Sequence, residues 1–163
     1  MQFWMVILSL HILFVGIWLV NFIADPIFKN SIASAKNLNS ESNLISLYLK
    51  FVNLLGMIGA TGILVTGILM VVLNPGYEFF QFSANHWLTA KQIVMVVILF
   101  LLGVKVIPAA KKLRLSISSD LKSPVEDKIQ VHENLKSLYQ VNFQMNLLVI
   151  INLLLAITRY LYS

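Results

Sequence analysis

The sequence predicts an all-α fold, a polytopic membrane protein in which four transmembrane helices form one bundle, a single domain over residues 1–163. Hydrophobic residues make up 58% of the chain, charged residues make up 12%, and the mean hydropathy is +0.82. A soluble domain carries roughly 25% charged residues because water must solvate its surface. The composition therefore indicates a lipid bilayer as the surrounding solvent. Four apolar stretches and a one-sided distribution of basic residues support the same prediction.

The composition also excludes several classes of function. The net charge of +5 does not indicate nucleic-acid binding, because basic residues of a membrane protein usually mark its cytoplasmic loops. The absence of cysteine removes disulfides, thiolate metal sites and thiol nucleophiles. The nucleotide-binding, serine-hydrolase and zinc-protease motifs do not occur in the sequence. Whether the protein is an enzyme therefore stays open.

Each apolar stretch is close to the roughly 20 residues that cross the hydrocarbon core as a helix. The predicted spans cover residues 3–23, 47–73, 88–107 and 141–162. We expect the first span to stop at Asp25-Pro26, because proline disrupts a helix interior. The second should end at Asn74-Pro75-Gly76, a strong turn signal.

The cytoplasmic connections should extend the helices beyond the lipid. Ser123, followed by Pro124 and by Glu126 three positions after the serine, is typical of a helix start and predicts one long helix into the fourth span. Ser40-Glu41 predicts a helix start leading into the second span, and residues 111–114 should prolong the third. These extensions together predict a short helical stalk on the cytoplasmic side.

The basic residues predict the orientation of the bundle. Ten of the 12 basic residues flank the first or the third connection: Lys29, Lys36, Lys50, Lys105, Lys111, Lys112, Arg114, Lys122, Lys128 and Lys136. Both termini should therefore lie outside, with these connections in the cytoplasm. Trp4, Tyr77 and Trp87 then fall at the outer interface, which amphipathic rings favour. A multi-pass protein of the bacterial inner membrane is the simplest expectation.

His11 is the first candidate for chemistry, because polar side chains inside a span are costly. Trp4, His11, Trp18 and Asp25 recur every seven residues, so they share one helix face that should point into the bundle. A neutral imidazole at this depth can ligate a haem iron. It can equally be a structural residue, hydrogen-bonded to a facing Asn, Thr or backbone carbonyl.

His86 and His132 are expected near the two surfaces, and no metal–carboxylate motif lies in a span.

Further polar and small residues leave similar alternatives. Lys91 lies about one turn into the third span, where it can snorkel to the interface or bind an anion such as a propionate. Gly56 and Gly59 belong to a small-residue side of the second span, which can pack against a helix or a flat macrocycle. The fourth span carries amides that should form inter-helix hydrogen bonds, at Asn142, Gln144, Asn146 and Asn152.

Short motifs in these spans resemble a superfamily of four-span membrane proteins that includes HemJ-type protoporphyrinogen oxidases and CopD-like proteins. The motifs are Leu10-His11-Ile12 followed by Gly16-Ile17-Trp18, Thr61-Gly62 with Thr66-Gly67-Ile68-Leu69, and Trp87-Leu88-Thr89-Ala90-Lys91. Residues 25–30 differ from the HemJ pattern, and the third span lacks a histidine, so the chain is most similar to an uncharacterised branch.

The resemblance implies an integral membrane haem b protein in electron transfer or porphyrin redox chemistry, with no other cofactor. His11 would be the axial ligand of the haem iron, and Lys91 would lie near a propionate or a substrate carboxylate. Trp18, Gly56 and Gly59 would lie against the macrocycle. The alternative is a non-catalytic accessory subunit of a larger respiratory or photosynthetic membrane complex, or a homo-oligomer, with lipid as its other partner.

Overall fold

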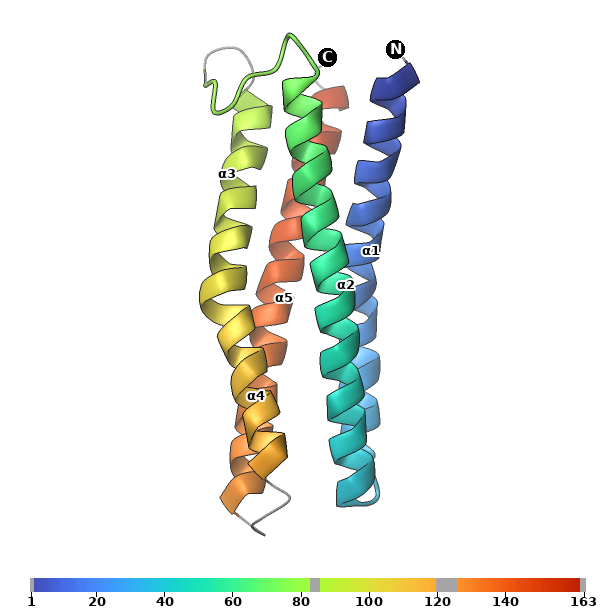
Figure 1. Cartoon of the computed structure of the whole chain (residues 1–163), viewed down its shortest axis with the longest axis vertical. Coiled ribbons are helices and arrows are strands. Elements are labelled where there is room, and N and C mark those ends of the chain that lie inside the picture. Colours follow the sequence, from blue (N-terminus) through green and yellow to red (C-terminus); the bar gives the residue numbers. More distant parts are fainter. Residues whose placement is uncertain (1, 83–85, 120–125, 162–163) are drawn as a thin grey trace.

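The structure, a computed structural model, describes residues 2–82, 86–119 and 126–161. It is an all-α bundle, as predicted, and the described part of the chain contains no strand (Figure 1). Its elements are α1 (Gln2–Ala33), α2 (Leu38–Val72), α3 (His86–Leu101), the π-helical turn η1 (Leu102–Val106), α4 (Ile107–Ser119) and α5 (Glu126–Leu161).

Four helical segments are long and apolar enough to cross a membrane, which confirms a multi-pass membrane protein. They are Phe3–Ala33, Leu38–Val72, His86–Ile117 and Ile129–Ile157. The segments lie side by side, and α1 begins at the same end of the bundle at which α5 finishes (Figure 1). We call this end the outer end, and we call the opposite end, where α1 turns into α2, the inner end.

The expected stop at Asp25-Pro26 is wrong. Pro26 lies inside α1, and the helix continues to Ala33. The reason is tertiary packing: Ala24 is 7% exposed and Ile32 is 5% exposed, so this stretch buries apolar side chains only if the helix continues. That burial offsets the loss of one backbone hydrogen bond at the proline.

The other boundaries agree more closely with the sequence. α2 ends at Val72, just before the predicted turn, in which the Gly76 N–H donates to Asn74 Oδ1 at 3.0 Å. The N-cap of α2 is Asn37 instead of Ser40, because Asn37 Oδ1 accepts from the Ser40 N–H at 2.8 Å. The Ser123 start signal lies outside the described residues, whereas α5 is one unbroken helix, as expected.

The helices extend well past the bilayer core. α2 contains 35 residues and is therefore about 52 Å long, against roughly 30 Å of hydrocarbon. At the inner end, α1, α2, α4 and α5 share a buried apolar core like that of a soluble bundle. This inner core consists of Ile32, Ile45, Tyr48, Leu49, Leu113, Val131, Leu135 and Leu138. The predicted stalk is thus a packed extension of the bundle.

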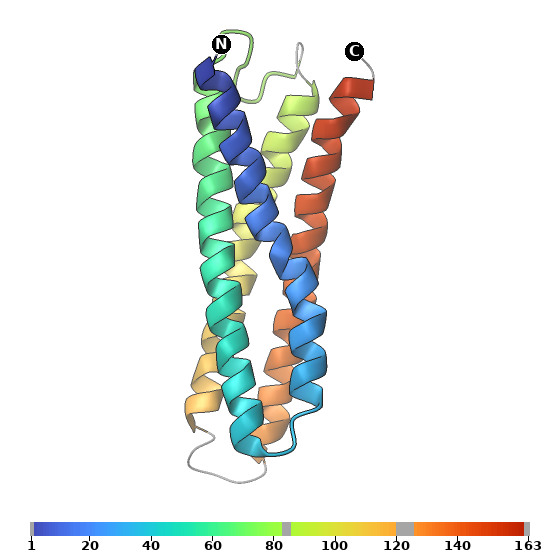
Figure 2. The ribbon, with the colours of Figure 1, turned by 90° about the vertical axis from the view of Figure 1, so that its right-hand side faces the viewer.

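A second cluster lies further toward the outer end, formed by Trp18, Ala60, Ile98, Met145 and Val149. Beyond it the helices separate into pairs. α1 packs mainly on α2, and α3 packs mainly on α5. Figure 2 shows α1 and α5 diverging toward the outer end. Apolar side chains exposed there, such as Phe3 and Val72, are the surface that lipid covers.

Small residues bring α1 and α2 into close contact. A Cβ added at Gly59 would lie 3.0 Å from Trp18 Cβ and 3.2 Å from its Cα, and one added at Gly62 would overlap the Phe14 ring. Gly56, one turn before Gly59, faces open space instead. The small-residue side of α2 therefore serves helix packing at Gly59 and Gly62.

This contrast gives a matched pair of substitutions. Gly59→Ala should lower the free energy of unfolding by about 1–3 kcal/mol, because the backbone of Trp18 cannot move away without separating the helices. Gly56→Ala should be neutral or stabilising by up to about 1 kcal/mol, because alanine favours a helix. Denaturant titration of the purified protein in mild detergent measures both. Equal destabilisation by the two variants would contradict the described packing.

Candidate functional site

His11 is held by a hydrogen bond across the α1–α2 contact. Its Nδ1 lies 2.8 Å from Thr66 Oγ1. The Thr66 hydroxyl, one turn above Gly62 on α2, donates to the Gly62 carbonyl oxygen at 2.5 Å. A hydroxyl has one proton to give, so toward the imidazole Thr66 can only accept. His11 therefore carries its proton on Nδ1, and the lone pair is on Nε2.

The Nε2 side of the ring is the chemically open side. Among the described residues, His11 makes its hydrogen bond through Nδ1, and none binds Nε2. The ring is half-buried, and a Cβ at Gly67 would be in ordinary contact with Cε1, at 3.6 Å. A histidine that ligates a metal has this arrangement: one nitrogen is fixed by a neighbouring acceptor and the other presents its lone pair.

Lys91 lies in the same outer half, on α3. Its Nζ is 6.0 Å from the centroid of the Trp87 ring. Its backbone oxygen accepts from Asn152 Nδ2 of α5 at 3.4 Å. His11 of α1 and Lys91 of α3, two of the predicted site residues, thus both lie in the outer half of the bundle (Figure 1).

Asn152 contributes an unsatisfied acceptor to this region. Its Oδ1 is buried and has no hydrogen-bond partner among the described residues. A buried carbonyl oxygen without a donor is unfavourable by about 1–3 kcal/mol. A water molecule or a ligand that donates a hydrogen bond to it would remove this cost. The turn of α5 that carries Asn152 packs on the Lys91 turn of α3.

The remaining predicted site residues lie nearer the middle of the bundle. Trp18 is 4% exposed, and its Nε1 donates to Asn146 Oδ1 at 3.1 Å. Gly59 packs directly on Trp18 in the contact between α1 and α2. Gly56 faces open space. A role for any of the predicted site residues in holding a cofactor stays a prediction.

A polar network lies between Trp18 and the inner end, and the sequence did not predict that Asp25 and Tyr48 would pair in it. Asp25 Oδ1 accepts from the Tyr48 hydroxyl at 2.9 Å, and the Tyr48 oxygen accepts from Asn142 Nδ2 at 2.9 Å. Asn146 Nδ2 lies 3.5 Å from Asp25 Oδ2. The network therefore joins α1, α2 and α5, and it confirms the expected inter-helix role of Asn142 and Asn146. The seven-residue repeat of Trp18 and Asp25 was the available signal.

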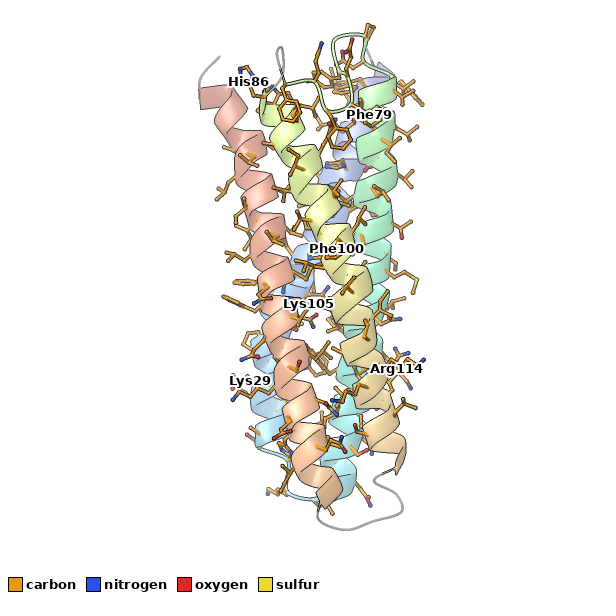
Figure 3. All side chains as sticks on the ribbon, turned by 90° about the vertical axis from the view of Figure 1, so that its left-hand side faces the viewer. Lys29, Phe79, His86, Phe100, Lys105 and Arg114 are labelled. Atoms are coloured by element: carbon orange, nitrogen blue, oxygen red, sulfur yellow. The ribbon has the colours of Figure 1, made fainter. Side chains whose placement is uncertain are left out.

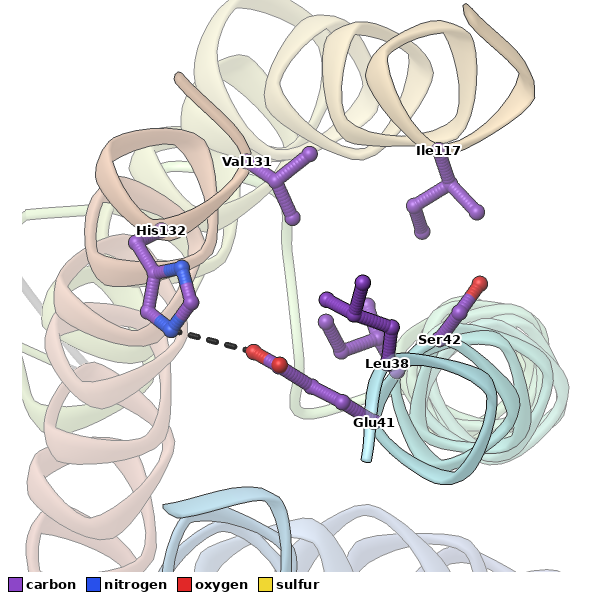
Figure 4. A pocket seen from close by; sticks show the side chains of 7 residues that line it. Leu38, Glu41, Ser42, Ile117, Val131 and His132 are labelled. Carbon is purple, nitrogen blue, oxygen red and sulfur yellow. Dashed lines mark ion pairs between the residues drawn. The ribbon is translucent and has the colours of Figure 1, made fainter. Parts of the chain in front are cut away.

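The other two histidines lie away from His11. His86 is exposed at the outer end, with Nδ1 at 2.7 Å from the Phe82 carbonyl oxygen. His132 Nε2 lies 3.0 Å from Glu41 Oε1 at the inner end, where the two side chains meet between α5 and α2 (Figure 4). In the part of the chain that the structure describes, no cluster of three or more His, Asp or Glu side chains could hold a metal ion.

Comparisons with protein-family models, with curated proteins and with solved structures find no match for this chain. A functional assignment therefore depends on the geometry of the His11 region and on the motifs in the spans. The resemblance to the HemJ-type and CopD-like superfamily stays a prediction.

The Thr66 hydroxyl should fix the tautomer of His11. In Thr66→Val the acceptor is lost, so the Nδ1–H form should no longer dominate, whereas Thr66→Ser keeps the acceptor and should keep the tautomer. The ¹⁵N chemical shifts of histidine-labelled protein in detergent micelles report which nitrogen carries the proton. Unchanged shifts in Thr66→Val would show that another group orients the ring.

The Asp25 network supplies a second matched pair. Tyr48→Phe removes the hydroxyl that donates to Asp25 and accepts from Asn142. It should lower the free energy of unfolding by about 1–3 kcal/mol. The neighbouring Tyr139 hydroxyl is buried without a hydrogen-bond partner among the described residues, so Tyr139→Phe should cause no loss. Chemical denaturation compares the two variants. A larger loss in Tyr139→Phe would mean that the network is wrongly described.

Proposed function

We propose that the protein binds haem b through His11 in the outer half of the bundle and takes part in electron transfer or porphyrin redox chemistry. The observation that carries the proposal is the hydrogen bond from His11 Nδ1 to Thr66, which leaves Nε2 with its lone pair and without a partner among the described residues. The resemblance of residues 10–18 and 87–91 to HemJ-type proteins agrees with this assignment.

His11, Thr66 and Lys91 have different roles in this proposal. His11 Nε2 would ligate the iron, and Thr66 would hold the ring in the ligating tautomer. Lys91 would offset the charge of an anionic group such as a propionate or a substrate carboxylate. The haem, when bound, would supply one-electron redox chemistry. The surrounding apolar helices would exclude water from the site.

The basic residues support an orientation for the proposed site. Lys29 and Arg114 lie toward the inner end, whereas Phe79 and His86 lie at the outer end (Figure 3). By the positive-inside rule the inner end would face the cytoplasm of a bacterial inner membrane, with both termini outside. His11 and Lys91 would then lie in the outer half of the membrane.

An accessory subunit is the second candidate, and the connection between α2 and α3 favours it. Phe79, Phe80 and Phe82 are 51%, 47% and 66% exposed there. Phe80 has a φ of 55°, an unfavourable conformation for a side chain of this kind, and its N–H donates to Gln92 Oε1 at 2.6 Å. Such a fixed group of exposed rings could contact a partner subunit or a second copy of the chain.

Haem binding is tested with protein expressed under haem-replete conditions and purified in mild detergent. We expect the pyridine haemochrome assay to find about one haem b per chain in the wild type and a loss of most of it in His11→Ala, because the iron ligand is gone. His86→Ala is the matched control and should retain the haem, since His86 is exposed at the outer end.

The same preparations separate the two candidates. A colourless wild-type protein that co-purifies with other membrane subunits would contradict haem binding and favour the accessory role. Equal haem content in wild type and His11→Ala would refute ligation by His11.

A further inference from the structure

α4 has two unlike sides. Its inward side carries Leu113, which is fully buried in the inner core against side chains of α2 and α5. Its outward side combines the exposed basic residues Lys111, Lys112 and Arg114 with exposed Leu115. Figure 3 shows Arg114 at the periphery of the bundle, in the half that contains the inner end. An apolar residue among exposed cations is typical of a helix surface at a membrane interface.

Among the described residues, no carboxylate forms an ion pair with the cations on α4. The sequence of α4 contains no acidic residue. Within the described ranges, the ion pair that forms at the inner end joins Glu41 to His132 and involves none of the three. This surface therefore presents a concentrated positive charge, and its partner should be an anion.

The position of α4 along the bundle indicates where that anion lies. α3 begins at His86, and a helix needs about 20 residues to cross the hydrocarbon core, so the chain leaves the core near the start of α4 at Ile107. The first turns of α4 are thus level with the lipid headgroups of the inner leaflet. Exposed Ile107 can remain in the acyl region while the longer basic side chains reach the phosphates.

The π-helical turn η1 connects α3 to α4 and determines which side of α4 faces the bundle. A π turn inserts an extra residue and so rotates all that follows about the helix axis. With this rotation, Leu113 enters the inner core and the basic residues point outward. Such turns occur often at functional sites.

We propose that Lys111, Lys112 and Arg114 form a binding surface for the phosphate headgroup of an anionic phospholipid in the inner-end leaflet. The planar guanidinium of Arg114 can hold two phosphate oxygens, and the two lysines add charge. Exposed Ile107 and Leu115 can contact the acyl chains of a lipid, which a free phosphate lacks. The surface is independent of the His11 site, so either proposal can fail alone.

The test is native mass spectrometry of the full-length protein in detergent, titrated with phosphatidylglycerol at low salt. The variant combines Lys111→Gln, Lys112→Gln and Arg114→Gln. The matched control combines Lys29→Gln, Lys36→Gln and Lys50→Gln, three exposed lysines from the α1–α2 side of the bundle, and so removes the same charge. We expect the α4 variant to bind phosphatidylglycerol on the order of a hundredfold more weakly, and the control to bind it like the wild type.

Several outcomes would overturn the proposal. An equal loss in the control would mean general attraction between a basic protein and acidic lipid. Inorganic phosphate that competes away the lipid at comparable concentration would make this a site for the free anion. If the α4 variant does not fold, Arg114→Lys and the salt dependence of wild-type binding replace it. Binding that salt does not weaken, or that Arg114→Lys leaves unchanged, would contradict recognition of the phosphate by the guanidinium.

Discussion

The close contact between α1 and α2 is the constraint on which the other polar contacts depend. Trp18 packs on Gly59 and Phe14 packs on Gly62, so the two antiparallel helices can adopt only one register. In that register His11 meets Thr66 toward the outer end, and Asp25 meets Tyr48 toward the inner end. A larger residue at Gly59 would shift both contacts, because the backbones could no longer approach.

The two ends of the bundle are stabilised in different ways. The inner end buries aliphatic side chains of four helices, as a soluble bundle does, because it extends beyond the lipid. The outer half leaves many apolar side chains exposed, and there lipid provides the apolar environment. Inter-helix polar contacts, such as that of Asn152 with the Lys91 backbone, are the specific links between helices in this half. The proposed cofactor region lies where packing alone does not join the helix pairs.

The sequence predicted the features that depend on composition and periodicity. Four apolar stretches predicted the four spans, and the seven-residue repeat placed His11, Trp18 and Asp25 on the interior face of α1. It failed at Pro26, because the burial of Ile32 that keeps the helix intact is a tertiary contact with no local signal. Tyr48 was missed for the same reason. Its partners lie 23 and 94 residues away in the chain, and single-sequence patterns do not report such pairs.

Ligation of haem iron by His11 is tested most directly by resonance Raman spectroscopy of the haem-loaded, reduced protein. The iron–imidazole stretching band reports a histidine bond to the metal and is independent of how much haem the protein holds. We expect this band in the wild type and in His86→Ala and its disappearance from any haem retained by His11→Ala. A band of the same frequency and intensity in His11→Ala would contradict the assignment, because another ligand would then hold the iron.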